Sequence, residues 1–360
     1  MRVLILAPYP HGEGPSQRFR YEQYLSYLEQ NGVRCDEQSF WSMDAWRVLY
    51  KPGHTLDKLT GFASGWLRRF AVLFSLNRYD VVFIQREAAP VGPPVVEWLI
   101  AKVWRKKIIY DFDDAIWSPQ QAWGNGMFSR LHFTGKTSTI CRLAAAVTPG
   151  NEFLAQYARE RNDAVYVVPT SIELDDYKAI PEPSSDDLFV VCWTGSTSTL
   201  VHFEHAREPL EQLAKHVRLV VKVICNKPPD RPIAGAEMRF VPWSPEREAE
   251  EVGDCHAGIM PLPDDEISRG KCGLKALQYM ATGRPVVVSP VGVNVDIVEH
   301  GRNGFLASTT EDFVGSLAEL AKSPGKRREM GANARKTVEE RYSAEVVSSA
   351  FAEVIRSVAR

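Results

Sequence analysis

Hydrophobic residues along the chain follow two alternating patterns. Short runs rich in β-branched residues are typical of buried parallel strands, and the segments between them repeat apolar residues every three or four positions, as helices do. We expect strands at 3–7, 33–35, 80–85, 108–111, 144–148, 165–169, 189–194, 219–224, 238–241, 257–260 and 286–288. Strands that alternate with helices predict parallel sheets, and therefore an α/β fold.

A proline-rich polar stretch at 180–187 interrupts this alternation and has the composition of a linker. We therefore expect two Rossmann-like domains, an N-terminal domain over 1–180 and a C-terminal domain over 183–342. The last helix, within 343–360, should pack back on the N-terminal domain. Because open α/β sheets bind ligands at the carboxyl ends of their strands, two facing domains would line an interdomain cleft.

The composition of the 360-residue chain is that of an ordinary globular protein, with 44% hydrophobic and 24% charged residues. A net charge of −2 gives no reason to expect nucleic acid as a partner. The six cysteines are scattered without a CxxC pair, which fits reduced thiols and argues against a disulfide framework or a zinc site. The N-terminal apolar run is broken early by proline, and no run approaches the roughly 18 residues that span a membrane. We expect a cytoplasmic protein, and a position at the inner face of the cell membrane stays open.

The stretch 261–294 carries the most specific local chemistry. Its turn at 269–273 contains two glycines and leads into an apolar helix that starts at Leu274, with Lys271 and Lys275 one turn apart. Free N–H groups and the positive end of a helix dipole attract anions. The stretch is therefore either a phosphate cradle or an ordinary loop, helix and strand with solvated lysines.

The same stretch resembles the core motif of the family 4 glycosyltransferases, which have the GT-B fold. Residues 264–280 and 283–287 follow the order of that motif, and 297–306 match its continuation closely. The resemblance extends to 168–172, which looks like the segment before the interdomain linker. It also includes 7–32, which looks like the N-terminal glycine loop and first helix.

The resemblance implies a GT-B enzyme that transfers a sugar, with retention, from a nucleotide-diphosphate donor to an acceptor hydroxyl, in polysaccharide or glycoconjugate biosynthesis. It implies no metal and no other cofactor. The C-terminal domain would bind the nucleotide sugar, and the N-terminal domain would bind a saccharide, a lipid-linked acceptor or a small molecule. Two variants look like those of a bacterial surface-polysaccharide subgroup: Asp111-Phe112-Asp113-Asp114 and Gly270-Lys271-Cys272-Gly273.

The chain departs from the family at its paired glutamates, which map onto Gly270 and Gln278. In the family the first glutamate contacts the donor sugar and the second contacts the ribose. Gln278 can still accept a hydrogen bond from a ribose hydroxyl, but Gly270 has no side chain to offer. Either Asp264, Asp265 or Glu266 supplies that carboxylate, or the sugar is held differently.

The arginine and lysine that follow the first strand of the family's C-terminal domain are also missing, and Gly195-Ser196-Thr197-Ser198 stands there. Lys271 and Lys275 would supply replacement charge. A departing nucleoside diphosphate develops negative charge, which preorganised N–H groups and cations stabilise without a metal. The expected donor-binding residues are Gly195, Ser196, Thr197, Glu266, Lys271, Cys272, Gly273, Leu274, Lys275 and Gln278.

Asp111, Asp113 and Asp114 end an expected strand of the N-terminal domain, where a ligand site is expected. An Asp-x-Asp pair holds a metal in GT-A enzymes, but the GT-B pattern favours positioning or deprotonating an acceptor hydroxyl. Capping and loop hydrogen bonds are the structural alternative. We take Asp111, Asp113 and Lys271 as the catalytic candidates. The expected acceptor-binding residues are Gly12, Gly14, Arg18, Arg86 and Asp114.

Two segments of the N-terminal domain, 66–78 and 95–107, mix Trp, Phe and Leu with Arg and Lys. They fit either contact with anionic lipid or two amphipathic helices that pack on the sheet and extend their basic groups to solvent.

Two other functions stay open besides glycosyl transfer. One is a GT-B-like sugar-nucleotide epimerase, which product analysis with donor alone would reveal. The other is a partner subunit that lost activity together with the glutamates, which donor hydrolysis or transfer abolished by Lys271→Ala would exclude.

Overall fold

The computed structural model describes residues 1–118, 133, 135–183 and 188–360. The chain forms two compact units: the first comprises Met1–Thr170, Gly270–Cys272 and Glu345–Arg360, and the second Ser171–Arg269 and Gly273–Ala344. The continuous N-terminal part of the first unit thus ends at Thr170, whereas the sequence placed the domain boundary near residue 180. Residues 184–187 of the expected linker lie outside the described residues.

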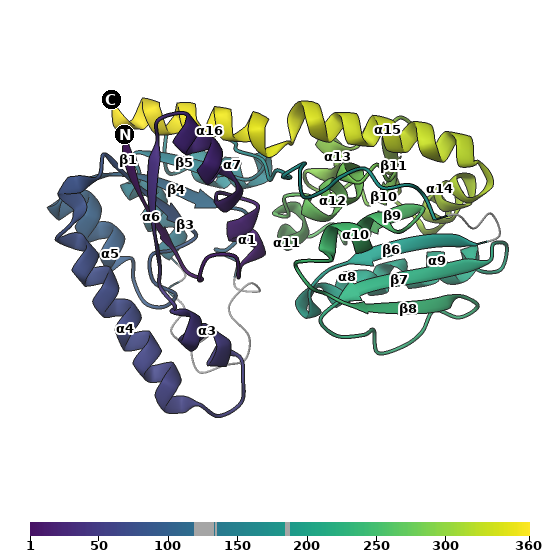
Figure 1. Ribbon diagram of the computed structural model, residues 1–360, viewed down its shortest axis with the longest axis horizontal. Coiled ribbons are helices and arrows are strands. Elements are labelled where there is room, and N and C mark those ends of the chain that lie inside the picture. The colour runs from purple at the N-terminus through teal and green to yellow at the C-terminus, as the bar shows by residue number, and fades with distance from the viewer. Residues whose placement is uncertain (119–132, 134, 184–187) are drawn as a thin grey trace. The chain divides into compact units, whose positions relative to one another are not determined.

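The first unit is built on a five-stranded sheet in the order β2-β1-β3-β4-β5, with every pair parallel. Its strands are β1 (Arg2–Ala7), β2 (Arg34–Ser39), β3 (Val81–Gln85), β4 (Lys107–Phe112) and β5 (Ala146–Pro149). Its α-helices are α1 (Pro15–Arg18), α2 (Leu25–Gln30), α3 (Met43–Leu49), α4 (Thr55–Leu73), α5 (Val95–Trp98), α6 (Lys136–Leu143), α7 (Glu152–Arg159) and α16 (Ala344–Ala359), as Figure 1 shows.

The C-terminal helix α16 packs on this first sheet. The ring of Phe351 lies 5.8 Å from that of Tyr24 and 5.2 Å from that of Phe83 in β3. Arg356 Nη2 donates a hydrogen bond to the carbonyl of Asn31 at 3.0 Å. The last helix is therefore part of the core of the first unit.

The second unit is built on a six-stranded parallel sheet in the order β11-β10-β9-β6-β7-β8. Its strands are β6 (Phe189–Thr194), β7 (Leu219–Cys225), β8 (Glu237–Pro242), β9 (Ala257–Met260), β10 (Val286–Val288) and β11 (Gly304–Leu306). Its α-helices are α8 (Leu200–Phe203), α9 (Arg207–Leu213), α10 (Glu248–Gly253), α11 (Glu266–Arg269), α12 (Leu274–Ala281), α13 (Asn294–Ile297), α14 (Thr310–Lys322) and α15 (Pro324–Arg341).

Burial explains why the strands read as continuous apolar runs. Every residue of β3, β9 and β10 is buried, because helices cover both faces of a parallel sheet. The edge strands β2 and β8 are partly exposed, and β2 is mostly polar. These two parallel sheets confirm the expected α/β class.

The prediction of a strand at 165–169 is wrong. Val165 forms a single bridge with Val147, and two further N–H groups donate to the carbonyls of Val147 and Pro149. A ladder cannot continue there because Pro149 has no N–H to donate.

Each sheet has a point where the strand order reverses, between β1 and β3 in the first unit and between β6 and β9 in the second. Loops at the carboxyl ends of such strands form the usual ligand site of an open α/β sheet. Among the described residues, no helix combines the length and the apolar character that crossing a membrane requires.

Candidate functional site

Polar side chains gather at the reversal point of the first sheet. Ser16, in α1, donates to Asp113 Oδ1 at 2.7 Å and accepts from Gln85 Nε2 at 2.7 Å. Arg86 follows β3, and its Nη1 lies 3.7 Å from Asp113 Oδ1 and 3.5 Å from Asp114 Oδ2. The structure therefore brings together three residues that the sequence singled out, Arg86, Asp113 and Asp114.

Arg86 holds a left-handed backbone conformation, with φ of 60°. Its N–H donates to the carbonyl of Asp111 at 2.7 Å. A non-glycine residue rarely adopts this conformation outside functional or tightly determined sites. The turn after β3 thus aims the guanidinium at the two aspartates.

The segment 270–272 belongs to this cluster. Lys271 Nζ lies 2.8 Å from Asp114 Oδ1, and Asn151 Nδ2 donates to the carbonyl of Lys271 at 2.9 Å. Cys272 Sγ donates to the carbonyl of Asp113 at 3.1 Å. Burial raises the pKa of the Cys272 thiol, so this sulfur stays neutral and acts as a packing group rather than a nucleophile.

A buried ion pair underlies the cluster. Arg20 Nη2 and Nε lie 2.5 and 3.2 Å from the two carboxylate oxygens of Asp111, and Thr148 Oγ1 donates to Asp111 Oδ1 at 2.9 Å. Both charged side chains are at most 1% exposed. Burial raises the pKa of Asp111 and Arg20 opposes that rise.

Asp111 was expected to be catalytic, but its carboxylate is paired with Arg20 and is only 1% exposed, which does not fit contact with an acceptor. The ion pair with Arg20 fixes the end of β4. The arginine expected to bind the acceptor was Arg18, whose guanidinium lies over the ring of Phe19 at 5.1 Å. Arg20 differs from Arg18 in its partner Asp111, which lies 91 residues away in the sequence.

The glycines of the first loop shape its backbone. Gly12 has φ of +81°, and its N–H donates to both carboxylate oxygens of Glu22 at 3.2 and 3.0 Å. A Cβ on Gly14 would lie 2.7 Å from Cδ2 of Tyr9. These two glycines therefore shape the loop, and their expected contact with an acceptor stays a prediction.

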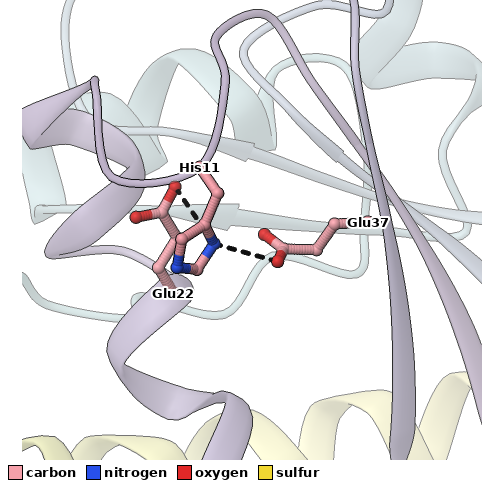
Figure 2. Close-up of side chains that lie close together, drawn as sticks. All are labelled: His11, Glu22 and Glu37. Carbon is pink, nitrogen blue, oxygen red and sulfur yellow. Dashed lines mark hydrogen bonds and ion pairs between the residues drawn. The ribbon is translucent and has the colours of Figure 1, made fainter. Parts of the chain in front are cut away.

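Beside this loop lies a trio of ionisable groups, His11, Glu22 and Glu37 (Figure 2). His11 Nδ1 is 3.0 Å from Glu37 Oε2 and 3.9 Å from Glu22 Oε1. Burial raises the pKa of Glu22. The imidazole faces two carboxylates, and the three ligand atoms lie within 4.8 Å of one another, close enough to hold a metal ion. The expected absence of a metal therefore stays a prediction.

In the second unit, the loop after β6 and the start of α12 come together. Lys275 Nζ lies 4.3 Å from the ring centroid of Trp193 and 3.4 Å from Thr199 Oγ1. A Cβ on Gly195 would lie 2.5 Å from Thr199 Oγ1, so only glycine lets the loop close this tightly. Ser196 and Thr197 are exposed.

The N-terminus of α12 has the geometry of an anion site. Gly273 precedes the helix with φ of +73°, and a Cβ there would overlap the side chain of Ile297. The N–H groups of Leu274, Lys275 and Ala276 precede the first bond of the helix, which Leu277 N–H donates to the Gly273 carbonyl at 3.1 Å. The helix dipole and the Lys275 ammonium make this end positive.

Gln278 faces the protein interior. Its side chain is 2% exposed and its Nε2 donates to the Tyr177 hydroxyl at 2.7 Å, which in turn donates to Glu248 Oε2 at 2.9 Å. The expected contact between Gln278 and a donor ribose does not fit this burial.

The acidic loop before α12 is internally bonded. Asp264 forms two bonds with Arg269, at 2.6 and 3.0 Å, and Asp265 Oδ1 accepts from the Ser268 N–H at 2.7 Å. Glu266 begins α11 and is exposed. Of the three carboxylates considered in place of Gly270, Asp264 and Asp265 hold the loop in shape.

Two Rossmann-like units, each with polar residues at the reversal point of a parallel sheet, define the GT-B class of fold. Residues 195–323 match the family model of the glycosyl transferases group 1. The match begins in the loop after β6 and includes all of α12. No curated protein matches the chain in sequence.

Solved structures of the same fold extend over the whole chain. HepE from Anabaena, solved in complex with UDP, is 15% identical with a TM-score of 0.64, covering 99% of this chain and 100% of that chain. Sucrose-phosphate synthase from Thermosynechococcus elongatus is 14% identical with a TM-score of 0.68, over 99% and 98% of the two chains. A glycosyltransferase from Rickettsia africae is 11% identical with a TM-score of 0.70, over the same shares. At identities this low, the similarity of these structures establishes the fold alone.

Proposed function

We propose that the protein is a glycosyltransferase that moves a sugar from a nucleoside-diphosphate donor to an acceptor hydroxyl, with retention at the anomeric carbon. One observation carries the proposal: the family match begins at the Gly195 loop, and the structure joins that loop to the positive end of α12 through Lys275. Structural neighbours solved with UDP or UDP-glucose support a nucleotide-sugar donor.

The donor diphosphate is assigned to the N-terminus of α12. The N–H groups of Gly273, Leu274 and Lys275 and the exposed Gly195–Thr197 loop offer hydrogen bonds, and the Lys275 ammonium adds charge. Glu266 is the carboxylate assigned to the sugar. This arrangement stabilises the leaving diphosphate without requiring a metal or another cofactor.

The acceptor is assigned to the cluster of Arg86, Asp113 and Asp114. Asp113 would orient the acceptor hydroxyl and take its proton. Lys271, held by Asp114 at 2.8 Å, would supply positive charge as the reaction proceeds. The buried pair of Asp111 and Arg20 would hold the end of β4, and with it Asp113 and Asp114, in place.

The finer assignments belong to the same proposal. They are membership of family 4 and its surface-polysaccharide subgroup, a role in polysaccharide or glycoconjugate biosynthesis, a cytoplasmic location, and a saccharide, lipid-linked or small-molecule acceptor. We expect no nucleic-acid partner, since the net charge is −2.

A thermal-shift screen of UDP-, GDP- and ADP-sugars tests donor binding. A ligand at 100 times its Kd stabilises a protein by about 2.7 kcal/mol, so one nucleotide class should raise the unfolding temperature. Lys275→Met keeps the packing on Trp193 and should weaken that donor roughly 10- to 100-fold, the value of a charge-assisted hydrogen bond. Lys336→Met, at an exposed ammonium, is the matched control.

This screen and two activity assays separate the competing functions. Absence of a shift with every sugar nucleotide would overturn the donor assignment. A changed sugar in a reaction that contains donor alone would identify an epimerase. Donor binding without hydrolysis or transfer, at any acceptor tried, would favour an inactive partner subunit.

A further inference from the structure

Helix α4 presents a stripe of large apolar side chains to solvent. Leu56, Leu59, Leu67 and Phe70, with Phe74 directly after the helix, recur at helical spacing and are 77%, 47%, 70%, 41% and 83% exposed. Figure 1 shows α4 running along the outer side of the first unit. Contiguous exposed apolar surface of this kind is uncommon on soluble proteins and marks an interaction site.

The opposite side of α4 is held firmly, so the exposed stripe is a fixed feature. Arg69 is fully buried and donates to the carbonyls of Ala7 at 2.7 Å and Ala88 at 2.6 Å. Gly65 is so close to Phe40 that a Cβ would lie 2.7 Å from its ring. The helix cannot rotate its apolar stripe inward without breaking these contacts.

Basic residues lie near the C-terminal end of the apolar stripe. The ring of Phe74 meets that of Trp104 at 6.2 Å, which places the end of α4 against the segment 95–107. In that segment Lys102, Arg105 and Lys107 are exposed. Its only acidic residue, Glu97, is 1% exposed and accepts from the Ala88 N–H at 3.0 Å.

Trp98 and Val103 extend the apolar surface within the same segment, at 49% and 52% exposure. We define the docking face as the α4 stripe, Trp98, Val103 and the three exposed bases. Aromatic and aliphatic groups beside lysine and arginine are the combination that binds the interface of an anionic bilayer.

We propose that the docking face binds the surface of an anionic lipid bilayer. The charge pattern decides between lipid and a second copy of the chain. A two-fold dimer would set the same patch against itself and bring like positive charges together, whereas anionic head groups neutralise them. The inference goes beyond glycosyl transfer, because lipid binding needs no sugar nucleotide.

Vesicle co-sedimentation of the full chain tests the proposal. We expect binding to vesicles of 70% phosphatidylcholine and 30% phosphatidylglycerol, and little to pure phosphatidylcholine. Phe74→Ser should weaken binding roughly tenfold, as the loss of one inserted aromatic side chain predicts. Lys102→Ala should weaken it about fivefold, the effect of one basic residue near such a surface.

Matched controls lie in the second unit. Val201→Ser changes a valine that is 60% exposed, and Lys336→Ala removes an exposed ammonium that has Glu340 as its partner. Neither should alter vesicle binding. Circular dichroism of each variant checks that the fold is retained.

Three results would overturn the inference. The first is absence of binding to anionic vesicles, and the second is binding that Phe74→Ser and Lys102→Ala leave unchanged. The third is a wild-type dimer in sedimentation velocity that Phe74→Ser converts to monomer, which would identify a self-association face. Because no donor is present, failure here leaves the proposed transfer reaction untouched.

Discussion

Replacing Asp111 and Asp113 separately by asparagine distinguishes the supporting carboxylate from the reacting one. Asp111 is paired with Arg20 in the interior, while Asp113 is 14% exposed and accepts from Ser16. Asp111→Asn removes a negative charge from a buried guanidinium and places an amide N–H₂ against its N–H donors. Asp113→Asn keeps an oxygen that Ser16 can donate to.

The expected magnitudes differ in kind. Breaking a buried ion pair by neutralising one partner costs about 3–5 kcal/mol. In a domain of 150–250 residues this lowers Tm by about 6–20 °C. Asp113→Asn should cost less than about 1 kcal/mol, the value of one neutral hydrogen bond, but should slow transfer roughly 100- to 10,000-fold if Asp113 takes the acceptor proton.

Urea unfolding followed by tryptophan fluorescence measures the first quantity. Among the described residues, six tryptophans lie in the first unit and two, Trp193 and Trp243, in the second, so the signal reports mainly on the first. Transfer under saturating donor measures the second. An Asp111→Asn protein as stable as wild type, or an Asp113→Asn protein with wild-type transfer, would refute the assignment of roles.

Three further predictions concern the same regions. Lys271→Met should slow transfer roughly 100-fold. Asp114→Asn in the Lys271→Met background should slow transfer little further, because the two groups act together. Full additivity of the two effects in this double-mutant cycle would contradict the pairing. Burial raises the folded-state pKa of Glu22, so its protonation stabilises the fold below the ordinary glutamate pKa and that contribution is lost as pH rises through the raised value. As the pH rises from about 4, wild type should therefore lose more unfolding free energy than Glu22→Gln. Urea unfolding that gives the same difference in free energy between the two proteins at every pH would count against this. EDTA should leave transfer unchanged, whereas a loss that His11→Ala reproduces would place a metal at the trio of Figure 2.

The sequence by itself determined the architecture and the glycine turn that begins α12. Alternating strand and helix patterns are properties of neighbouring residues, so the two parallel sheets could be predicted from them. The glycine turn before Leu274 could be predicted for the same reason, because a helix start always presents free N–H groups. The strand expected at 165–169 failed where a proline in its neighbour, Pro149, decided the pairing.

Only the tertiary structure decided which side chains work together. Asp111, Asp113 and Asp114 look equivalent in the sequence, yet the first is buried with Arg20 from 91 residues away and the third meets Lys271 from 157 residues away. Strand registers and loop paths set these partners, and local patterns carry no record of them. Gln278 likewise proved to face inward.

The α4 stripe is a second feature that local sequence patterns left undecided. Its spacing is that of an ordinary amphipathic helix, and the sequence left open whether the apolar residues pack on the sheet or meet lipid. The structure buries Arg69 and exposes Leu67 and Phe74 instead. Which side of a helix is covered depends on its anchors in the sheet, and those come from β1 and the turn after β3.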